Sequence, residues 1–219
     1  LATLRATADR LRTELDAACG KLSRARAVAA PKLGAQVTAE LARLGMPAAR
    51  FSVQLTQLAE PCASGGEEIE FLMTTNPGED PRPLAKVASG GELSRLMLAL
   101  KCVAMRRDDV PILIFDEIDA GISGAVAHAV AERLQRLADA HQVFVITHMP
   151  QIASRATAHF TVDKRTTDER TSVGMRRLAA DDRADEVSRM LGGDSDLARA
   201  HARELLEHAA VAPRATATL

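Results

Sequence analysis

The chain has 219 residues, of which 28 are basic, 29 are acidic and 47% are hydrophobic. This length suits one ordinary domain with an appendage. The balanced charge argues against a purely electrostatic nucleic-acid binder and leaves local basic patches open. Three widely spaced cysteines fit no metal or disulfide pattern, which favours a reducing compartment. Because no apolar run approaches ~18 residues, we expect no membrane partner.

The first residues carry a heptad pattern, with hydrophobic side chains at alternating steps of three and four. This period predicts a coiled-coil helix, roughly 44 Å long, that needs a partner strand. An amphipathic helix lying on a globular core is the alternative. We expect Pro31 to end this helix and a second helix to cover Leu33–Leu44. The pattern positions are Leu1, Leu4, Ala8, Leu11, Leu15, Ala18, Leu22, Ala25 and Ala29.

The predicted domains are a coiled-coil segment at 1–30, a globular lobe at 31–210 and a flexible tail at 211–219. Alternating residues predict strands over Phe51–Leu58 and Glu67–Thr75. A helix is expected from near Ser89 to about Arg107. A polar-tipped hairpin at His159–Leu178 and two short closing helices, Asp185–Gly193 and Leu197–Ala210, follow further along the chain.

Between these elements, two apolar runs flank a helix that Ser123 can cap. Strand, helix and strand at this spacing predict a right-handed βαβ crossover with two parallel buried strands, and therefore an α/β fold. Ligands of such sheets lie beyond the carboxyl ends of the strands. Asp116 and Glu117 end the first run, PILIFDE, whereas Thr147 and His148 end the second. All four are expected to face one crevice.

An apolar strand that ends in Asp-Glu is the pattern of a Walker B element. The first acid, Asp116, can hold Mg²⁺, and Glu117 can polarise a water that attacks a γ-phosphate. A strand can also end on acids for capping or turn reasons alone. A lone His such as His148 is more often structural than catalytic, but its place on the neighbouring strand favours a functional role.

The stretch ASGGELSR contains two glycines at an expected helix start. Such a start offers backbone N–H groups and a positive dipole end to a phosphate, and Ser89 adds a hydroxyl. The alternative is a simple N-cap, in which Ser89 and Glu92 form a capping box.

The order of these elements resembles an ABC-type ATPase lobe. The segments LAKVASGGELSRLMLALK, ILIFDEIDAGISG and VFVITHMPQIA resemble the C-terminal half of the bacterial RecN DNA-repair proteins, relatives of the SMC ATPases. The resemblance runs from the heptads to roughly Leu206. It implies the C-terminal lobe of an ABC/SMC-type ATPase head, a mainly parallel sheet flanked by helices, with an N-terminal coiled-coil helix.

The resemblance also implies a role for each matching residue, with ATP and Mg²⁺ as cofactors. Asp116 matches the magnesium residue, Glu117 the catalytic base, Asp119 the D-loop and His148 the switch histidine. Ala88 and Ala120 depart from the usual Leu and Thr without removing a charge or ligand. The signature that closes over ATP is matched by Ser89, Gly90, Gly91 and Glu92.

One departure is large, because no G-x-x-x-x-G-K-[ST] phosphate loop is present. The resemblance therefore implies half a site, with residues 1–30 as the returning coiled-coil helix. Its partners are an N-terminal Walker A lobe missing from this chain, a second copy in an ATP-sandwiched homodimer, and DNA, in the cytoplasm at the nucleoid. Alone, this chain is expected to bind ATP poorly and hydrolyse essentially none.

Three alternatives stay open. They are a non-enzymatic dimerisation module with a degenerate ABC fold, a transporter ATPase domain, and another SMC-like or Rad50-like head. Because the signature and the Asp-Glu pair lie one helix and one loop apart, a single head is not expected to bring both to one γ-phosphate. Candidate DNA contacts are Arg165, Arg170, Arg176 and Arg177, with a solvated polar face as the alternative.

Overall fold

The computed structural model describes residues 1–86, 89–105, 109–167, 170–193 and 195–211. Two compact units are distinguished, Leu1–Ser89 and Gly90–Leu219, and each is described by itself. Ala88 and residues 212–219 of the expected tail lie outside the described residues.

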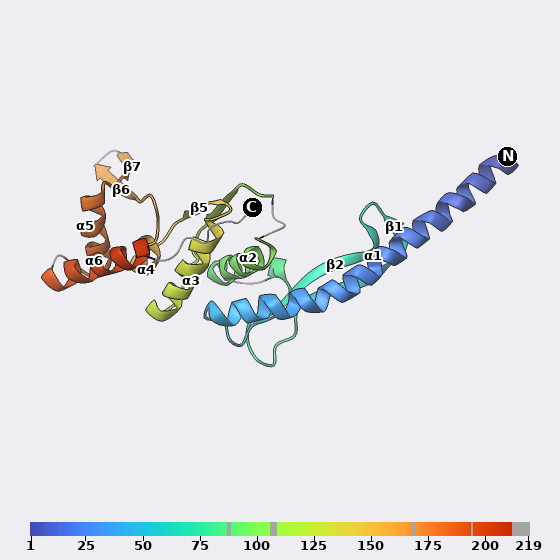
Figure 1. Ribbon diagram of the computed structural model, residues 1–219, viewed down its shortest axis with the longest axis horizontal. Coiled ribbons are helices and arrows are strands. Elements are labelled where there is room, and N and C mark those ends of the chain that lie inside the picture. The colour runs from blue at the N-terminus through green and yellow to red at the C-terminus, as the bar shows by residue number, and fades with distance from the viewer. Residues whose placement is uncertain (87–88, 106–108, 168–169, 194, 212–219) are drawn as a thin grey trace. The chain divides into compact units, whose positions relative to one another are not determined.

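The first unit is built on one long helix, α1, which spans Ala2–Arg43 (Figure 1). The expectation that Pro31 ends this helix was wrong, because Pro31 lies inside it. Because proline has no backbone N–H, the carbonyl of Ala27 loses the helical hydrogen bond that residue 31 would otherwise donate. Both residues are exposed, so water can satisfy that carbonyl. The helix ends where Gly45 adopts a φ of 80°.

A three-stranded antiparallel sheet packs along α1. Its strands are β1 (Arg50–Cys62), β2 (Gly65–Thr74) and the short β3 (Arg82–Pro83), followed by the 3₁₀ turn η1 (Leu84–Lys86). The two predicted strands are confirmed, and each is longer than the segment of alternating residues that predicted it, Phe51–Leu58 for β1 and Glu67–Thr75 for β2. Thr38 on α1 accepts a hydrogen bond from the backbone N–H of Phe51 at 3.0 Å, which joins helix and sheet.

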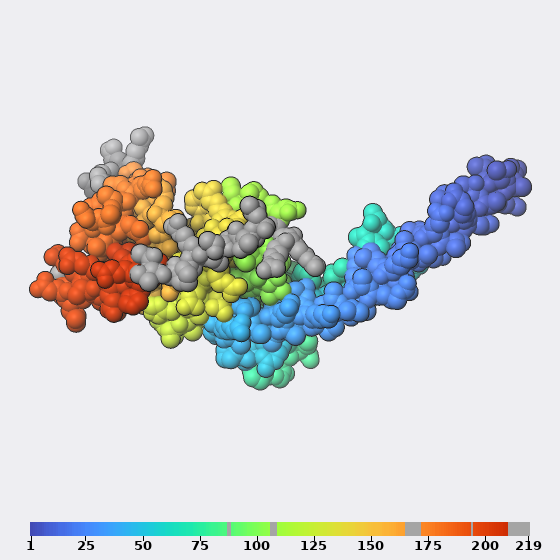
Figure 2. All heavy atoms as spheres, viewed as in Figure 1, coloured from blue at the N-terminus to red at the C-terminus, as the bar shows by residue number. Residues whose placement is uncertain are grey.

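The far end of this hairpin also contacts α1. Arg26 donates to the carbonyl of Ser64 at 2.6 Å and lies 3.8 Å from Glu67. N-terminal to this contact the hairpin still reaches the helix, because Gly65 and Gly66 lie beside Leu22 and Cys19, and Arg12 lies 3.9 Å from Glu60. Figure 2 shows the dark blue start of the helix extending beyond the hairpin. The heptad leucines there are exposed, Leu4 by 74% and Leu11 by 51%.

The second unit contains the predicted βαβ crossover. Helix α2 (Gly90–Ala104) leads to β4 (Ile112–Phe115), α3 (Gly124–Leu137) and β5 (Gln142–Val145). β4 and β5 pair in parallel, as predicted. One face of the pair is buried through Leu113 and Phe115. Ser123 occupies the N-cap of α3, but its side chain makes no capping hydrogen bond.

The remainder of this unit is a hairpin and three helices. The predicted hairpin is confirmed as β6 (Phe160–Thr167) and β7 (Arg170–Arg177). The helices are α4 (Pro150–Ala153), α5 (Ala180–Met190) and α6 (Asp196–Val211). The α/β class is confirmed, and the described parallel sheet has two strands, β4 and β5. Among the described helices, none is long and apolar enough to cross a membrane.

Candidate functional site

The predicted acidic pair lies in a sharp turn directly after β4. Asp116 and Glu117 are exposed, whereas Ile118 is fully buried and anchors the turn in the core. The backbone N–H of Glu117 donates to Oδ1 of Asp116 at 2.9 Å. Glu117 adopts a φ of 56°, a left-handed conformation that costs free energy in a residue other than glycine. We call residues 116–120 the acid turn.

The first turn of α2 lies directly against the acid turn. A Cβ on Gly91 would stand 3.1 Å from the carbonyl oxygen of Glu117 and 2.9 Å from the Cβ of Ala120. A Cβ on Gly90 would meet the carboxylate of Glu117, whose Cδ is 3.3 Å away. The two glycines therefore let the helix start and the acid turn touch. Their separation along the chain did not predict this contact. That a single head does not bring both to one γ-phosphate stays a prediction.

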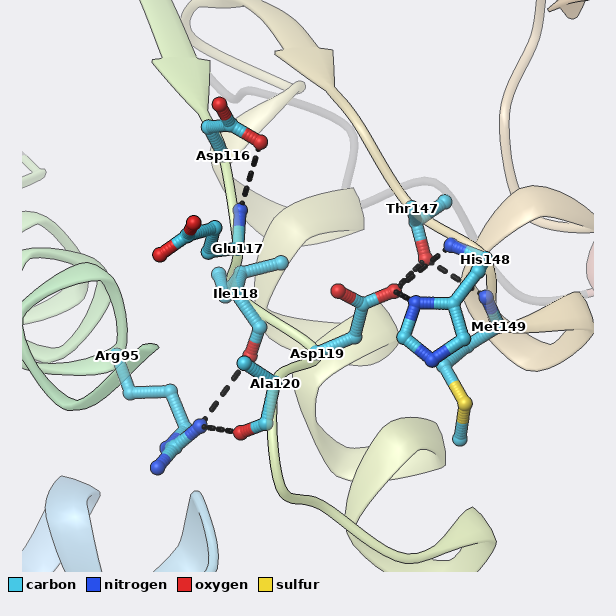
Figure 3. A network of polar contacts seen from close by, with 9 residues as sticks. All are labelled: Arg95, Asp116, Glu117, Ile118, Asp119, Ala120, Thr147, His148 and Met149. Atoms are coloured by element: carbon cyan, nitrogen blue, oxygen red, sulfur yellow. Dashed lines mark hydrogen bonds and ion pairs between the residues drawn. The ribbon is translucent and has the colours of Figure 1, made fainter. Parts of the chain in front are cut away.

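A second cluster joins the acid turn to the end of β5 (Figure 3). Asp119 is only 5% exposed, and its Oδ2 accepts from the hydroxyl of Thr147 at 2.5 Å. The same oxygen accepts from the backbone N–H of His148 at 2.9 Å and lies 3.1 Å from Nδ1 of its ring. A carboxylate at Nδ1 orients the imidazole and favours a proton on that nitrogen. The side chain of His148 is 77% exposed, so the ring is held but accessible.

Two further residues hold the acid turn, and sequence reasoning missed both. Ser94 donates to the carbonyl oxygen of Asp116 at 2.6 Å. Arg95, which is 7% exposed, donates to the carbonyl oxygen of Ala120 at 2.8 Å. Burial lowers the pKa of the Arg95 guanidinium, and the charge of Glu92 acts in the opposite direction. The available signal was an arginine one helical turn after Gly91, on a face otherwise made of buried Leu and Ala.

The donor set suits a magnesium nucleotide only in part. Among the described residues, no group of three or more His, Cys, Asp and Glu side chains is placed to hold a metal ion. Mg²⁺ commonly uses one or two carboxylates and takes its other ligands from phosphates and water. The exposed carboxylate of Asp116 fits that pattern. Ser89, the first signature residue, is exposed and directly precedes α2.

The candidate DNA contacts show no common cluster in the described side chains. Arg176 forms an ion pair with Asp182 at 2.8 Å, and Arg177 is exposed on β7. The side chains of Arg165 and Arg170 lie outside the described part of the structure.

Comparison with known proteins gives similar sequences among bacterial DNA-repair proteins. No protein-family model matches the chain. "DNA repair protein RecN" of Deinococcus radiodurans is 48% identical over 205 residues, which is 93% of this chain and 36% of the relative. The protein of the same name from Streptomyces coelicolor is 45% identical over 215 residues, 92% of this chain and 38% of the relative. This chain therefore spans just over a third of the length of these curated relatives.

Solved structures of SMC head domains are also similar. The head domain of Smc from Pyrococcus furiosus, with an extended coiled coil and bound to the C-terminal domain of ScpA, has a TM-score of 0.48 at 18% identity. This similarity covers 87% of the present chain and 47% of that one. The Smc head with coiled coil and joint from Pyrococcus yayanosii has a TM-score of 0.48 at 19% identity, covering 95% of this chain and 36% of that one.

Proposed function

Because this chain is of the RecN type along more than nine tenths of its length, we propose that it is the C-terminal half of an ATPase head. The whole protein would act in DNA double-strand-break repair and recombination, in the cytoplasm at the nucleoid. Its heads would join and separate in an ATP cycle and so change how the protein holds DNA. The relatives are named as DNA repair proteins, which supports the repair role.

The acid turn is the observation that carries the proposal. It touches the glycine-rich start of α2 on one side, through Gly91, and holds His148 through Asp119 on the other. An acidic pair, a phosphate-type helix start and an oriented imidazole are the groups that phosphoryl transfer needs around a γ-phosphate. Here the acidic pair and the imidazole lie at the carboxyl ends of two parallel strands, and the helix start lies beside them, where it would serve the opposite head.

The proposed roles follow the chemistry of each side chain. Asp116 would bind Mg²⁺, which supplies charge neutralisation to the phosphates. Glu117 would accept a proton from the attacking water. The imidazole of His148, fixed by Asp119 at Nδ1, would present Nε2 to the γ-phosphate side. The N-terminus of α2 would supply N–H donors to a phosphate, with Ser89 adding its hydroxyl.

A second lobe would complete this site, and the open face of β4 and β5 supports that proposal. Buried parallel sheets are covered on both faces, but one face here is exposed. Ile114 is exposed by 70% and Ile146 by 61%. The remaining two thirds of the relatives' length is enough chain for a Walker A lobe that covers this face and supplies the missing phosphate loop.

The competing proposal is a degenerate ABC fold that only dimerises. The Asp119–His148 contact argues against it, because a degenerate site has no reason to keep a buried carboxylate on an exposed imidazole. Turnover by the full-length protein separates the two.

The test compares ATP hydrolysis by the full-length protein and by its Glu117→Gln variant. The amide keeps the shape but cannot take the proton, so we expect ATP binding to persist and turnover to fall by about 10²–10⁴-fold. Glu70→Gln, a matched change at an exposed position on β2, should leave turnover unchanged. Wild-type turnover in Glu117→Gln would remove Glu117 as the base, and no turnover in any form would favour the dimerisation module.

Pairing of two heads is tested separately with Ser89→Arg. Added bulk at the start of α2 should block ATP-driven dimerisation while single-head ATP affinity stays nearly unchanged. In a mixture of Ser89→Arg with Glu117→Gln, a mixed dimer has one site with both defects and one with neither. Partial return of turnover is therefore expected if each signature serves the opposite head. Unchanged dimer mass in Ser89→Arg would return Ser89 to the role of a helix cap.

A further inference from the structure

Two adjacent side chains of helix α2 form hydrogen bonds with the backbone of the acid turn. Ser94 donates to the carbonyl oxygen of Asp116 at 2.6 Å. Arg95 donates through Nη1 to the carbonyl oxygen of Ala120 at 2.8 Å, with a longer contact of 3.5 Å to that of Ile118 (Figure 3). The dipeptide Ser94-Arg95 thus holds the turn at its beginning, middle and end.

The contact of Ser94 has a direct effect on Asp116. The carbonyl of Asp116 and the N–H of Glu117 belong to one planar peptide unit, so fixing one fixes the other. That N–H donates to Oδ1 of Asp116 at 2.9 Å. Ser94 therefore sets the direction of the Asp116 carboxylate and the starting point of the Glu117 side chain.

Arg95 acts on the other half of the site. Its two acceptors belong to the residues that flank Asp119, and Oδ2 of Asp119 holds the backbone N–H of His148 at 2.9 Å. A shift of either flanking carbonyl moves Asp119 and with it the imidazole.

Stability alone gives a weak reason for this arginine. Arg95 is 7% exposed, it donates to neutral carbonyls, and its Nε is buried with no hydrogen-bond partner in the described structure. A buried cation with incomplete partners is often matched or exceeded in stability by a well-packed apolar side chain. The left-handed turn at Glu117, in contrast, needs outside contacts to persist.

We propose that Ser94 and Arg95 are positioning residues, which couple the signature helix to the catalytic acid and the switch histidine of the same head. Any displacement of α2 when a second head engages is transmitted through Ser94 to Asp116 and Glu117, and through Arg95 to Asp119 and His148. This inference rests on the proposed function. It adds a route by which engagement of one site adjusts the acids of its own chain.

The test uses the full-length protein with Ser94→Ala, Ser94→Thr, Arg95→Met and Arg95→Lys. Misplacement of catalytic groups can cost about 10²-fold in rate. We therefore expect Arg95→Met to lower kcat by about 10- to 100-fold with KM within about 3-fold. Ser94→Ala should lower kcat and also raise the Mg²⁺ concentration needed for half-maximal rate. Ser94→Thr keeps the hydroxyl and should restore both.

Arg183→Met is the matched control. Arg183 is a second partly buried arginine that donates to two carbonyl oxygens, of Ser154 at 3.2 Å and Ala156 at 2.7 Å, away from the acid turn. It should leave kcat within about 2-fold even if it lowers the unfolding temperature. Equal losses of kcat in Arg95→Met and Arg183→Met would reduce Arg95 to a structural role.

A second readout needs no hydrolysis and separates this inference from the proposed function. The imidazole NMR signals of His148 in nucleotide-free protein should shift in Arg95→Met and partly recover in Arg95→Lys, but not move in Arg183→Met. Unmoved His148 signals in Arg95→Met overturn the coupling whatever the ATPase assay gives. Shifted His148 signals in a protein that shows no turnover would support the coupling and contradict the proposed ATP hydrolysis.

Discussion

At the scale of single residues, the acid turn depends on two glycines with different neighbours. A side chain at Gly91 would press on backbone, because its Cβ would lie 3.1 Å from the carbonyl oxygen of Glu117 and 3.2 Å from that of Ala120. At Gly90 the obstacle is the end of the flexible Glu117 side chain. Neither glycine has a positive φ, so a side chain at either position would be disfavoured by steric crowding and not by the backbone conformation.

We therefore predict that Gly91→Ala lowers the free energy of unfolding by about 1–3 kcal/mol, as over-packing does in tight sites. Gly90→Ala should change it by less than about 0.5 kcal/mol, or raise it slightly through the helix propensity of Ala. Its effect should instead appear in turnover, because the Glu117 carboxylate must leave its place. Urea unfolding of both variants measures the difference, and equal losses would show that Glu117 cannot move aside.

The places of the candidate site residues at the ends of strands and in loops could be predicted from the sequence, but their contacts could not. Asp116, Glu117, Asp119 and His148 follow strands or loops of recognisable pattern. That the carboxylate of Asp119 holds His148 depends on the parallel register of β4 and β5, which only the structure gives. Arg95 was missed because a charge on an apolar helix face has no sequence motif of its own.

At the scale of elements, periodicity predicted the strands and the hairpin well, and local rules failed at Pro31. A proline inside a helix costs about 3 kcal/mol in isolation, and the sequence alone gives no reason to accept that cost. The sheet beside α1 supplies one, since Phe51 and Thr38 bond helix to strand C-terminal to the proline, and Arg26 and Ser64 do so before it. Tertiary contacts of this kind are long-range in sequence and leave no periodic signal.

A prediction for the pH dependence of stability follows from His159, the residue directly before β6, and from two charged residues of α5. His159, which precedes β6, is half-buried and faces Arg183 and Glu186 of α5. Burial first, and then the charge of Arg183, lower the pKa of His159 below its ordinary 6.5, while Glu186 acts to raise it. The unfolded chain therefore binds this proton at a higher pH than the folded chain.

It follows that the contribution of His159 to stability is fully present above about pH 6.5 and is lost as the pH falls through the lowered value. The free energy of unfolding should decrease less between pH 7.5 and 5.5 in His159→Phe than in the wild type. Thr161→Val, a change on β6 that involves no titrating group, serves as the control and should keep the wild-type slope. The same slope in His159→Phe and wild type would contradict the assignment.

At the scale of the whole molecule, the chain exposes an apolar sheet face, which we propose the second lobe covers. Exposed side chains alternate along β4 and β5, and parallel sheets seldom leave such a face to water. The face consists of Ile112, Ile114, Phe144 and Ile146.

We predict that Ile114→Glu changes the stability of this chain by no more than about 1 kcal/mol, since the side chain is already 70% exposed. In co-expression with the upstream half of the gene, the same change should abolish co-purification and ATP hydrolysis. Leu197→Glu, at another highly exposed apolar position on α6, should affect neither. Intact co-purification of Ile114→Glu would mean that the missing lobe docks elsewhere.

The sheet that lies along α1 also has a mechanical consequence. Hydrogen bonds join it to the helix at Thr38 and Arg26, and an ion pair at 3.9 Å joins Arg12 to Glu60. Pro31 therefore lies within a stretch that the sheet supports and is not free to act as a hinge. A bending load on α1 would therefore concentrate N-terminal to Arg12, beyond the last of these contacts. Limited proteolysis of the chain should accordingly cut α1 before Arg12 first, and early cleavage around Pro31 would contradict the support by the sheet.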